Sequence, residues 1–247
     1  MNSEEELLKK RFKELANKSY TRNIPVFTNF LGLLELSAFH ESSRDFSHVP
    51  YELNGGTDFA ERVVVQFGGF ELPYPIACIH VKPVQKKFSD TLTHRDFLGA
   101  LVNLGIKREL LGDIIIHDNE AFVFCIDSMA DFIMEQLDRV KHTSVKCSLF
   151  DGTFDEIQIK TTNKELNVAS LRLDAVVAEV CKLSRSQALA LFREKKVFLS
   201  GRLMENNSYQ LKPLDIVTVR GFGRFEFGDT VRETKKGRYF VTVKLYG

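Results

Sequence analysis

The chain has 247 residues, 44% of them hydrophobic, and its 34 Lys and Arg nearly balance 33 Asp and Glu to give a net charge of +1. This composition is that of a globular protein and excludes a disordered one, and the sequence lacks the roughly 18 uninterrupted apolar residues of a membrane span. The acidic start MNSEEELLKKRF differs from a signal peptide, which has a basic start and an apolar run, so we expect a cytoplasmic protein that does not contact a membrane.

The charges are distributed unevenly along the chain. Residues 1–165 hold 19 Lys and Arg against 25 Asp and Glu, a net charge of −6, whereas residues 166–247 hold 15 against 8, a net charge of +7. An asymmetry of this kind steers an anionic partner toward the basic end, although a merely solvated surface often carries the same charge. The basic C-terminal third therefore makes nucleic acid a candidate partner.

The N-terminal segment, residues 1–74, is predicted to combine helices with a strand. Capping-box spacing of Ser and Glu followed by an apolar stripe predicts a helix over residues 4–17. A second helix is predicted after Thr28, and the β-branched run RVVVQF predicts a strand at 62–67. The Gly/Pro-rich stretch GGFELPYP at 68–75 marks the end of this segment.

Residues 75–150 alternate strands and helices in an order that defines a fold. The strand IACIHVKPV is followed by a helix at 93–104, the strands DIIIH and AFVFCI around a turn, a helix at 128–140 and the strand TSVKCSL. This βαββαβ order predicts a ferredoxin-like plait, in which two helices cover one face of a four-stranded antiparallel sheet. Both helices are predicted to start with a capping box, Thr93 with Asp96 and Ser128 with Asp131. Phe122 and Phe124 share one face of a central strand, where they either stack bases or, as we expect, pack in a core.

The basic region follows a polar stretch. Residues 151–169 are predicted to form a turn, a short strand and a connector. Residues 170–247 are predicted to form helices at 171–180 and 185–194 and then the strands VFLSG, DIVTVRG and RYFVTVKLY. The fold class is therefore α+β, in a multidomain chain.

The stretch LRLDAVVAEVCKLSRSQALALFREKKVFLSGRLMENNSYQLKPLDIVTVR resembles the S4 RNA-binding domain, an αL-type RNA-binding fold. Two positions depart from the family pattern, since Lys195 and Leu214 stand where many S4 domains have Gly. The resemblance implies that this C-terminal domain docks on RNA.

The residues themselves favour phosphate binding at the second helix of this domain. Ser184 can cap that helix while Gln187 reaches back, which leaves Arg185 in the first turn, off the apolar stripe and facing solvent. Backbone N–H groups at a helix start and an outward guanidinium both suit an anionic ligand. Any single cation can instead be solvated or paired within the chain, as Arg172 could be with Asp174. The predicted RNA-binding residues are Arg172, Lys182, Ser184, Arg185, Gln187, Lys195, Lys196, Arg202, Arg220 and Arg224.

The stretch VRGFGRFEF at 219–227 is close to the aromatic strand motif of an RRM, but its context excludes that domain. An RRM places this strand third in a βαββαβ unit with a helix after it, whereas here two helices precede and strand-like residues follow. The stretch is instead predicted to extend the last S4 strand, with Gly221 and Gly223 at a sharp bend.

That tail, together with THRDFLGALVNLGIKRELLGDIIIHDNEAFVFC, is similar to the YlmH-type S4 proteins of bacteria and plastids. This resemblance implies a partner in the large ribosomal subunit, either rRNA or ribosome-bound tRNA, and a role in handling stalled translation. A possible second RNA contact lies in the plait and comprises His94, Arg95, Lys107 and Arg108.

Two other classes of function stay open as alternatives. S4 domains are often attached to RNA-modifying enzymes, but no catalytic, cofactor-binding or metal-ligand constellation stands out, so we expect no catalysis, no cofactor and no small-molecule substrate. Cys78, Cys125, Cys147 and Cys181 lack C-x-x-C spacing and are predicted to be reduced core residues. The other alternative is a protein-binding adaptor, for example in cell division, which salt-sensitive RNA binding would exclude.

Overall fold

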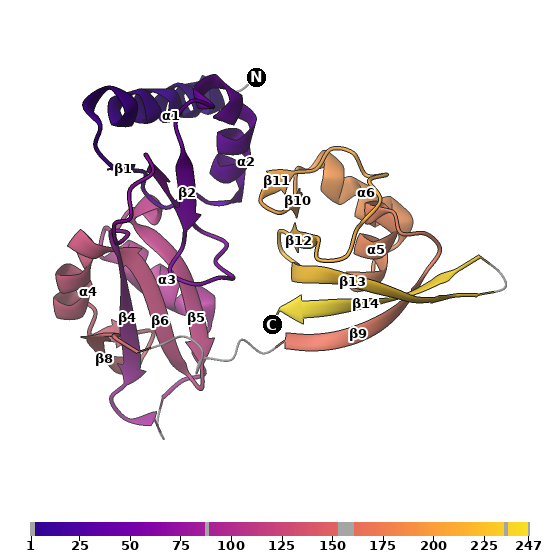
Figure 1. Cartoon of the computed structure of the whole chain (residues 1–247). Coiled ribbons are helices and arrows are strands. Elements are labelled where there is room, and N and C mark those ends of the chain that lie inside the picture. Colours follow the sequence, from indigo (N-terminus) through magenta and orange to yellow (C-terminus); the bar gives the residue numbers. More distant parts are fainter. Residues whose placement is uncertain (1–2, 87–88, 153–160, 235–236, 247) are drawn as a thin grey trace. The chain divides into compact units, whose positions relative to one another are not determined.

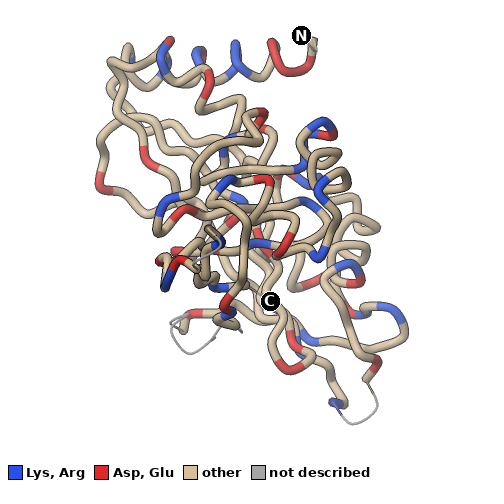
Figure 2. The backbone as a smooth tube through the Cα atoms, turned by 90° about the vertical axis from the view of Figure 1, so that its right-hand side faces the viewer, with Lys and Arg blue, Asp and Glu red and all other residues tan. Residues whose placement is uncertain are grey.

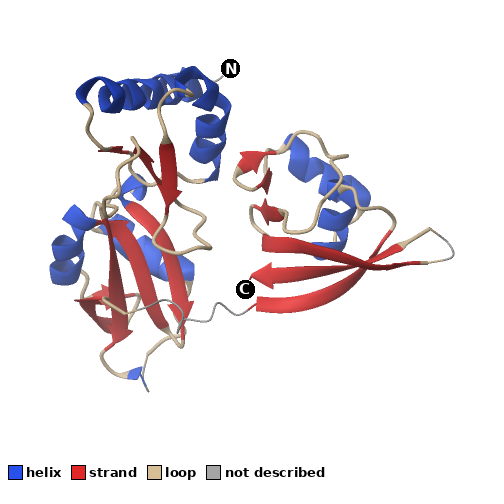
Figure 3. Cartoon of the chain, in the orientation of Figure 1, coloured by secondary structure: helices blue, strands red, loops and turns tan. Residues whose placement is uncertain are grey.

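The computed structural model describes residues 3–86, 89–152, 161–234 and 237–246 (Figure 1). The chain forms two units, residues 1–157 and residues 158–247, and each is described by itself. Helices and strands occur in both units, which confirms the α+β class (Figure 3). The predicted domain boundary near residue 75 falls inside the first unit and stays a prediction.

The first unit begins with helices packed on a small antiparallel sheet of order β1-β3-β2. Phe12 on α1 is buried against Phe39 on α2, with ring centroids 5.3 Å apart, so the predicted apolar stripe is the packed face. The helix α1 continues past its predicted end at residue 17, and the buried hydroxyl of Ser19 in its last turns donates to the backbone oxygen of Phe67. The elements are α1 (Ser3–Arg22), β1 (Val26–Phe27), α2 (Leu33–Ser42), η1 (Ser43–Phe46), β2 (Tyr51–Asn54) and β3 (Val64–Phe67).

A five-stranded antiparallel sheet of order β5-β6-β4-β8-β7 forms the rest of the first unit. α3 and α4 pack on one face of it (Figure 1), where Phe97, Leu101 and Ile133 share a core with Ile79 and Val123. The elements are β4 (Ile76–Pro83), α3 (His94–Asn103), η3 (Arg108–Leu110), β5 (Leu111–His117), β6 (Glu120–Ile126), η4 (Asp127–Met129), α4 (Ala130–Gln136), β7 (Arg139–Val140) and β8 (Thr143–Leu149).

The opposite face of this sheet is covered by the N-terminal segment. Phe122 and Phe124 are only 6% and 2% exposed and form a cluster with Phe30 and Val64. The expectation that these two rings pack in a core is therefore confirmed, and base stacking on this part of the sheet is excluded by their burial.

The two helices of the sheet differ in how well the sequence predicts them. Thr93 and Asp96 form the predicted capping box, with the backbone N–H of Thr93 donating to the Asp96 carboxylate at 2.8 Å. The predicted capping box at Ser128 is wrong, because Ser128 lies in a 3-10 turn and its N–H is bonded to the Asp127 side chain. α4 also ends at Gln136 instead of residue 140, since Val140 is buried as part of the short strand β7.

The second unit is a six-stranded antiparallel sheet of order β11-β10-β12-β13-β14-β9 with both helices packed on it. Val176 and Val177 of α5 and Leu191 of α6 share a core with Phe225 and Phe227 of the sheet. The elements are β9 (Thr161–Val168), α5 (Leu173–Val180), α6 (Arg185–Arg193), β10 (Val197–Leu199), β11 (Arg202–Leu203), β12 (Ile216–Val219), β13 (Gly223–Glu233) and β14 (Tyr239–Tyr246).

Part of the predicted connector belongs to this sheet. Residues 161–168 form β9, which pairs along its whole length with β14, whereas residues 153–160 of the connector lie outside the described residues. β9 is an edge strand that buries Leu166 and Val168 while most of its side chains are polar. A strand with so little apolar alternation has the composition of a linker, which explains why the sequence predicts only a short strand and a connector in residues 151–169.

The stretch 220–224 forms a hairpin turn. Val219 pairs with Gly223, so the chain reverses direction between β12 and β13 instead of extending one strand. The predicted sharp bend is confirmed, because Gly221 and Gly223 have φ angles of 89° and 119°, which L side chains rarely adopt.

Lys195 and Leu214, which stand where the S4 domains that the sequence resembles often have Gly, have a backbone conformation that favours glycine. Their φ angles are 54° and 72°, in the left-handed region. Holding a residue with a Cβ atom in this region costs about 1 kcal/mol or more. The two turns therefore hold Lys195 and Leu214 in an unfavourable conformation at the expense of some stability.

We predict that Leu214→Gly stabilises the protein by about 0.5–1 kcal/mol, because the side chain is 75% exposed and its removal relieves an unfavourable φ angle. Urea unfolding of the full chain would measure the change. Leu214→Ala is the matched control, since it shortens the same side chain without relieving the backbone, and equal effects of both substitutions would contradict the explanation.

Candidate nucleic-acid interface

The start of α6 has the geometry that the sequence predicts. The Ser184 hydroxyl accepts a hydrogen bond from the N–H of Gln187 at 3.3 Å, and the Gln187 side chain accepts one from the N–H of Ser184 at 2.9 Å. This capping box fixes the first turn, and the buried stripe begins at Ala188. Arg185 consequently faces solvent, with 73% of its side chain exposed.

A buried carboxylate lies beneath this turn. Asp174 on α5 is 1% exposed and accepts two hydrogen bonds from Arg172, at 3.0 and 2.7 Å, and a third from the amide of Asn207 at 3.1 Å. Burial alone would raise the pKa of Asp174, but the hydrogen bonds and charge of Arg172 outweigh it and hold the pKa below its usual value. Arg185 approaches the same carboxylate at 3.9 Å, a longer contact than that of Arg172.

The start of α5 is occupied by the chain itself. The N–H groups of Leu173 and Asp174 donate to the backbone oxygens of Tyr209 and Asn207, at 2.8 and 3.0 Å. Arg172 is only 32% exposed and is held by Asp174. An anion would have to displace these bonds, so of the two helix starts that of α6 is better placed for a ligand.

Of the other predicted cations, Lys182 lies before the start of α6 and Lys195 and Lys196 lie after its end, and Figure 2 shows the backbone of all Lys and Arg residues in blue. Lys182, next to the capped start, and Lys195, just past the end, are exposed. The nine-residue helix between them is roughly 13 Å long, so Lys182 and Lys195 lie at opposite ends of α6. Lys196 is paired with Glu194 at 2.6 Å, and its backbone oxygen accepts from the N–H of the exposed Arg220 at 2.9 Å.

Arg202 and Arg224 differ in their surroundings. Arg202 is exposed in β11, where it pairs with Leu199. Arg224 is half-buried at the start of β13, with its guanidinium carbon 5.2 Å from the centre of the Tyr246 ring. Arg202 is therefore the more accessible of the two to a ligand.

The four residues of the predicted second RNA contact, in the first unit, differ in their exposure and in their hydrogen bonds. Arg95 and Lys107 are exposed. Arg108 is half-buried and donates to the backbone oxygens of Leu111 and Gly112, both at 3.1 Å, and burial together with the charge of Arg62 lowers its pKa to about 10. His94 is exposed, but partial loss of hydration and the charge of Arg108 lower its pKa. Arg95 and Lys107 are thus the two members of this set whose charges are available to a partner.

Sequence reasoning missed a second inward-facing arginine. Arg62 donates to the backbone oxygens of Phe30, Arg108 and Leu111 at 2.8–3.1 Å, and its own N–H is bonded to Asp113. Burial lowers its pKa. The charge of Arg62 is used to join three segments of the first unit, and no local motif in the sequence signals this role.

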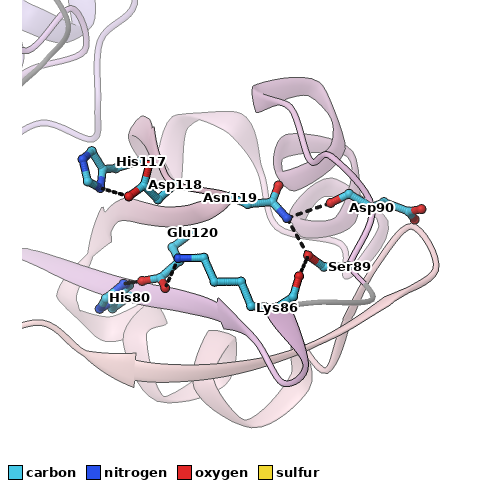
Figure 4. A network of polar contacts seen from close by, with 8 residues as sticks. All are labelled: His80, Lys86, Ser89, Asp90, His117, Asp118, Asn119 and Glu120. Atoms are coloured by element: carbon cyan, nitrogen blue, oxygen red, sulfur yellow. Dashed lines mark hydrogen bonds and ion pairs between the residues drawn. The ribbon is translucent and has the colours of Figure 1, made fainter.

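A polar network lies on the sheet of the first unit (Figure 4). His80 contacts Glu120 at 2.8 Å, Glu120 is 3.4 Å from Lys86, and the His80 ring is stacked on Phe122 at 4.2 Å. Burial lowers the pKa of His80 despite the carboxylate beside it. The network occupies the polar side of β4, which the alternation of IACIHVKPV signals, and it covers Phe122.

Within the described ranges, no group of three or more His, Cys, Asp or Glu side chains could hold a metal ion. Among the helices that the structure describes, none is long and apolar enough to cross a membrane. Cys78 and Cys125 are buried, Cys147 and Cys181 are half-buried, and all four are free thiols.

We predict that Asp174→Asn lowers the free energy of unfolding by about 3 kcal/mol at pH 7, because it leaves Arg172 without its buried carboxylate. Since the folded-state pKa of Asp174 is depressed, its contribution is present above the unfolded pKa of about 3.9 and is lost as the pH falls through the folded value. The difference between the two proteins should therefore shrink below about pH 4. Asp229→Asn, at an exposed position, is the control, and a loss independent of pH would contradict the ion-pair explanation.

Comparison with known proteins places the chain in a family. Residues 72–153 match the sequence model of a family described as "Putative RNA-binding domain in YlmH". The chain is 30% identical over 197 residues to "Ribosome-associated protein quality control protein P2" of Bacillus subtilis (strain 168), with 76% of this chain and 75% of that protein covered. A solved structure described as "Cell division protein ylmH from Streptococcus pneumoniae" superposes with a TM-score of 0.51 and 20% identity, over 63% of this chain and 95% of that one, which indicates a shared fold. The extent and identity of the match to the Bacillus subtilis protein show that this chain belongs to the YlmH family.

Proposed function

We propose that this chain is a non-catalytic RNA-binding protein of ribosome-associated quality control, which docks on structured RNA. The target in this proposal is rRNA of the large ribosomal subunit or ribosome-bound tRNA, in the handling of stalled translation. Its second unit is taken as an S4 RNA-binding domain and residues 75–150 as a ferredoxin-like plait. The names of the Bacillus subtilis relative and of the matching family support the ribosomal and RNA-binding parts of this proposal.

The observation that carries the proposal is the exposed Arg185 at the capped start of α6. A cation there is poorly placed to stabilise its own helix, because the positive end of the helix dipole favours anions. The 3.9 Å contact with Asp174 is long, and Arg172 already holds that carboxylate. The charge of Arg185 is therefore best used by an external anion, and a phosphate suits both the guanidinium and the helix start.

Docking in this way requires no covalent chemistry. Lys182, Lys195, Arg202 and Arg220 are exposed on the same basic unit and would add phosphate contacts to that of Arg185. Phosphate contacts of this kind position a protein on RNA and make its affinity depend on salt. Arg95 and Lys107 of the first unit are candidates for a second contact, within the residues that match the RNA-binding family.

We predict that Arg185→Ala weakens binding of the full chain to isolated large ribosomal subunits by about 10- to 150-fold, the equivalent of one lost charge-assisted contact of roughly 1.5–3 kcal/mol. With about four phosphate contacts, the logarithm of the association constant should fall with log salt at a slope near −3. Because the variant loses one contact, its slope should be less negative by about 0.7–0.9. Filter binding over a range of KCl concentrations would measure both quantities, with bulk tRNA as a second ligand.

Two control variants separate binding from stability. Arg232→Ala removes an exposed positive charge from β13 of the same unit and should change affinity much less. Ser184→Ala removes the cap and should cost about 1 kcal/mol of stability. If Arg185→Ala lowers the melting temperature but leaves the affinity of the folded protein unchanged, Arg185 is a structural residue and the proposed surface is wrong.

A further inference from the structure

The turn between β12 and β13 presents an aromatic ring to solvent. Phe222 is 51% exposed, whereas Phe225 and Phe227 in the following strand are each 1% exposed. A Cβ atom added at Gly221 or Gly223 would meet nothing within 4 Å, so these glycines set the backbone shape of the turn and are not required by close packing. Leaving a Phe ring half in water forgoes part of the stabilisation that full burial would provide.

Phe222 borders a cavity within the second unit. The cavity has a volume of about 290 Å³, and its apolar lining includes Cys181 at the end of α5 and Leu245 and Tyr246 at the end of β14. Its size is near the lower limit of about 300 Å³ for small-molecule pockets, which fits one flat group better than a larger ligand. Burial raises the pKa of the Cys181 thiol to about 11, so this part of the lining is uncharged at neutral pH.

Cations lie around this apolar cavity. Arg224 and Lys244 both approach the Tyr246 ring, at 5.2 and 5.5 Å from its centre. Arg220 is exposed two residues before Phe222 in the same turn, and Lys182 is exposed directly after Cys181. The nearby carboxylate of Glu226 accepts a hydrogen bond from the Tyr246 hydroxyl at 2.9 Å. An apolar cavity bordered by an exposed aromatic ring and by positive charges complements a nucleotide, which joins an aromatic base to an anionic phosphate.

We propose that this cavity takes one unpaired nucleobase of the bound RNA, stacked on Phe222, while Arg220 and Lys182 contact the flanking phosphates. The inference rests on the proposed RNA-binding function and assigns the turn 220–224 a role in it. Stacking on an aromatic ring is available to every base, so the site favours unpaired over paired RNA without selecting a particular base. An apolar peptide would use the ring equally well but would gain nothing from the cations.

The test is a double-mutant cycle with the full chain and two RNA hairpins that share one stem. The unpaired loop carries normal nucleotides in one hairpin and abasic sugars in the other, so both have the same phosphates. We expect the natural protein to bind the normal loop about tenfold more tightly than the abasic loop. Phe222→Leu should lose this difference while its affinity for the abasic loop and its salt dependence stay unchanged, and Phe222→Tyr, which keeps an aromatic ring, should retain it.

Three outcomes would overturn the inference. If Phe222→Leu discriminates the loops as the natural protein does while Arg185→Ala is weakened, the base pocket is wrong and the RNA-binding function stands. If Phe222→Leu binds both hairpins normally but loses affinity for intact large subunits, the ring contacts a protein. If Phe222→Leu weakens binding to both hairpins equally and lowers the melting temperature, Phe222 is structural. Failure of the proposed function itself is distinguishable, because neither hairpin, tRNA nor large subunits would then bind the natural protein.

Discussion

The candidate interface depends on one buried negative charge. The carboxylate of Asp174, 1% exposed, requires compensation, and it receives this from Arg172 on the chain just before α5 and from Asn207 on the loop that follows β11. Backbone bonds from Leu173 and Asp174 to the same loop strengthen the connection. Arg185 lies 3.9 Å from this carboxylate, and the capping box of Ser184 and Gln187 fixes the start of α6 beside it. The charge that a ligand would meet thus lies next to a charge that no ligand can reach.

Five arginines of the described structure fall into two groups with different roles. Arg62, Arg108 and Arg172 donate to backbone oxygens or to the buried carboxylate, and their charges stabilise the fold. Arg185 and Arg220 face solvent on the basic unit. Removing a member of the first group is expected to affect stability, whereas removing a member of the second is expected to affect binding. Fewer cations of the second unit are therefore available to RNA than its positive charge suggests.

Much of the fold follows from the sequence because its signals are local. The alternation of strands and helices in residues 75–150, the capping boxes at Thr93 and Ser184 and the glycine bend at 220–224 depend on neighbouring residues, and the structure has all of them. The failures concern elements defined by distant partners: α4 ends early because Val140 is buried in a strand, and β9 exists because β14 pairs with it. The site shows the same division. Exposure of Arg185 follows from helix periodicity, but whether Lys107 or Arg108 faces solvent depends on carbonyl groups that the sequence alone does not place.

Crosslinking tests the central claim, that the second unit carries the RNA-binding surface, most directly. The full chain would be irradiated with ultraviolet light while bound to large ribosomal subunits, and the peptides joined to RNA would be identified by mass spectrometry. We expect RNA-linked peptides from residues 182–202 and from the turn at 220–224. Crosslinks confined to the first unit, residues 1–157, would contradict it.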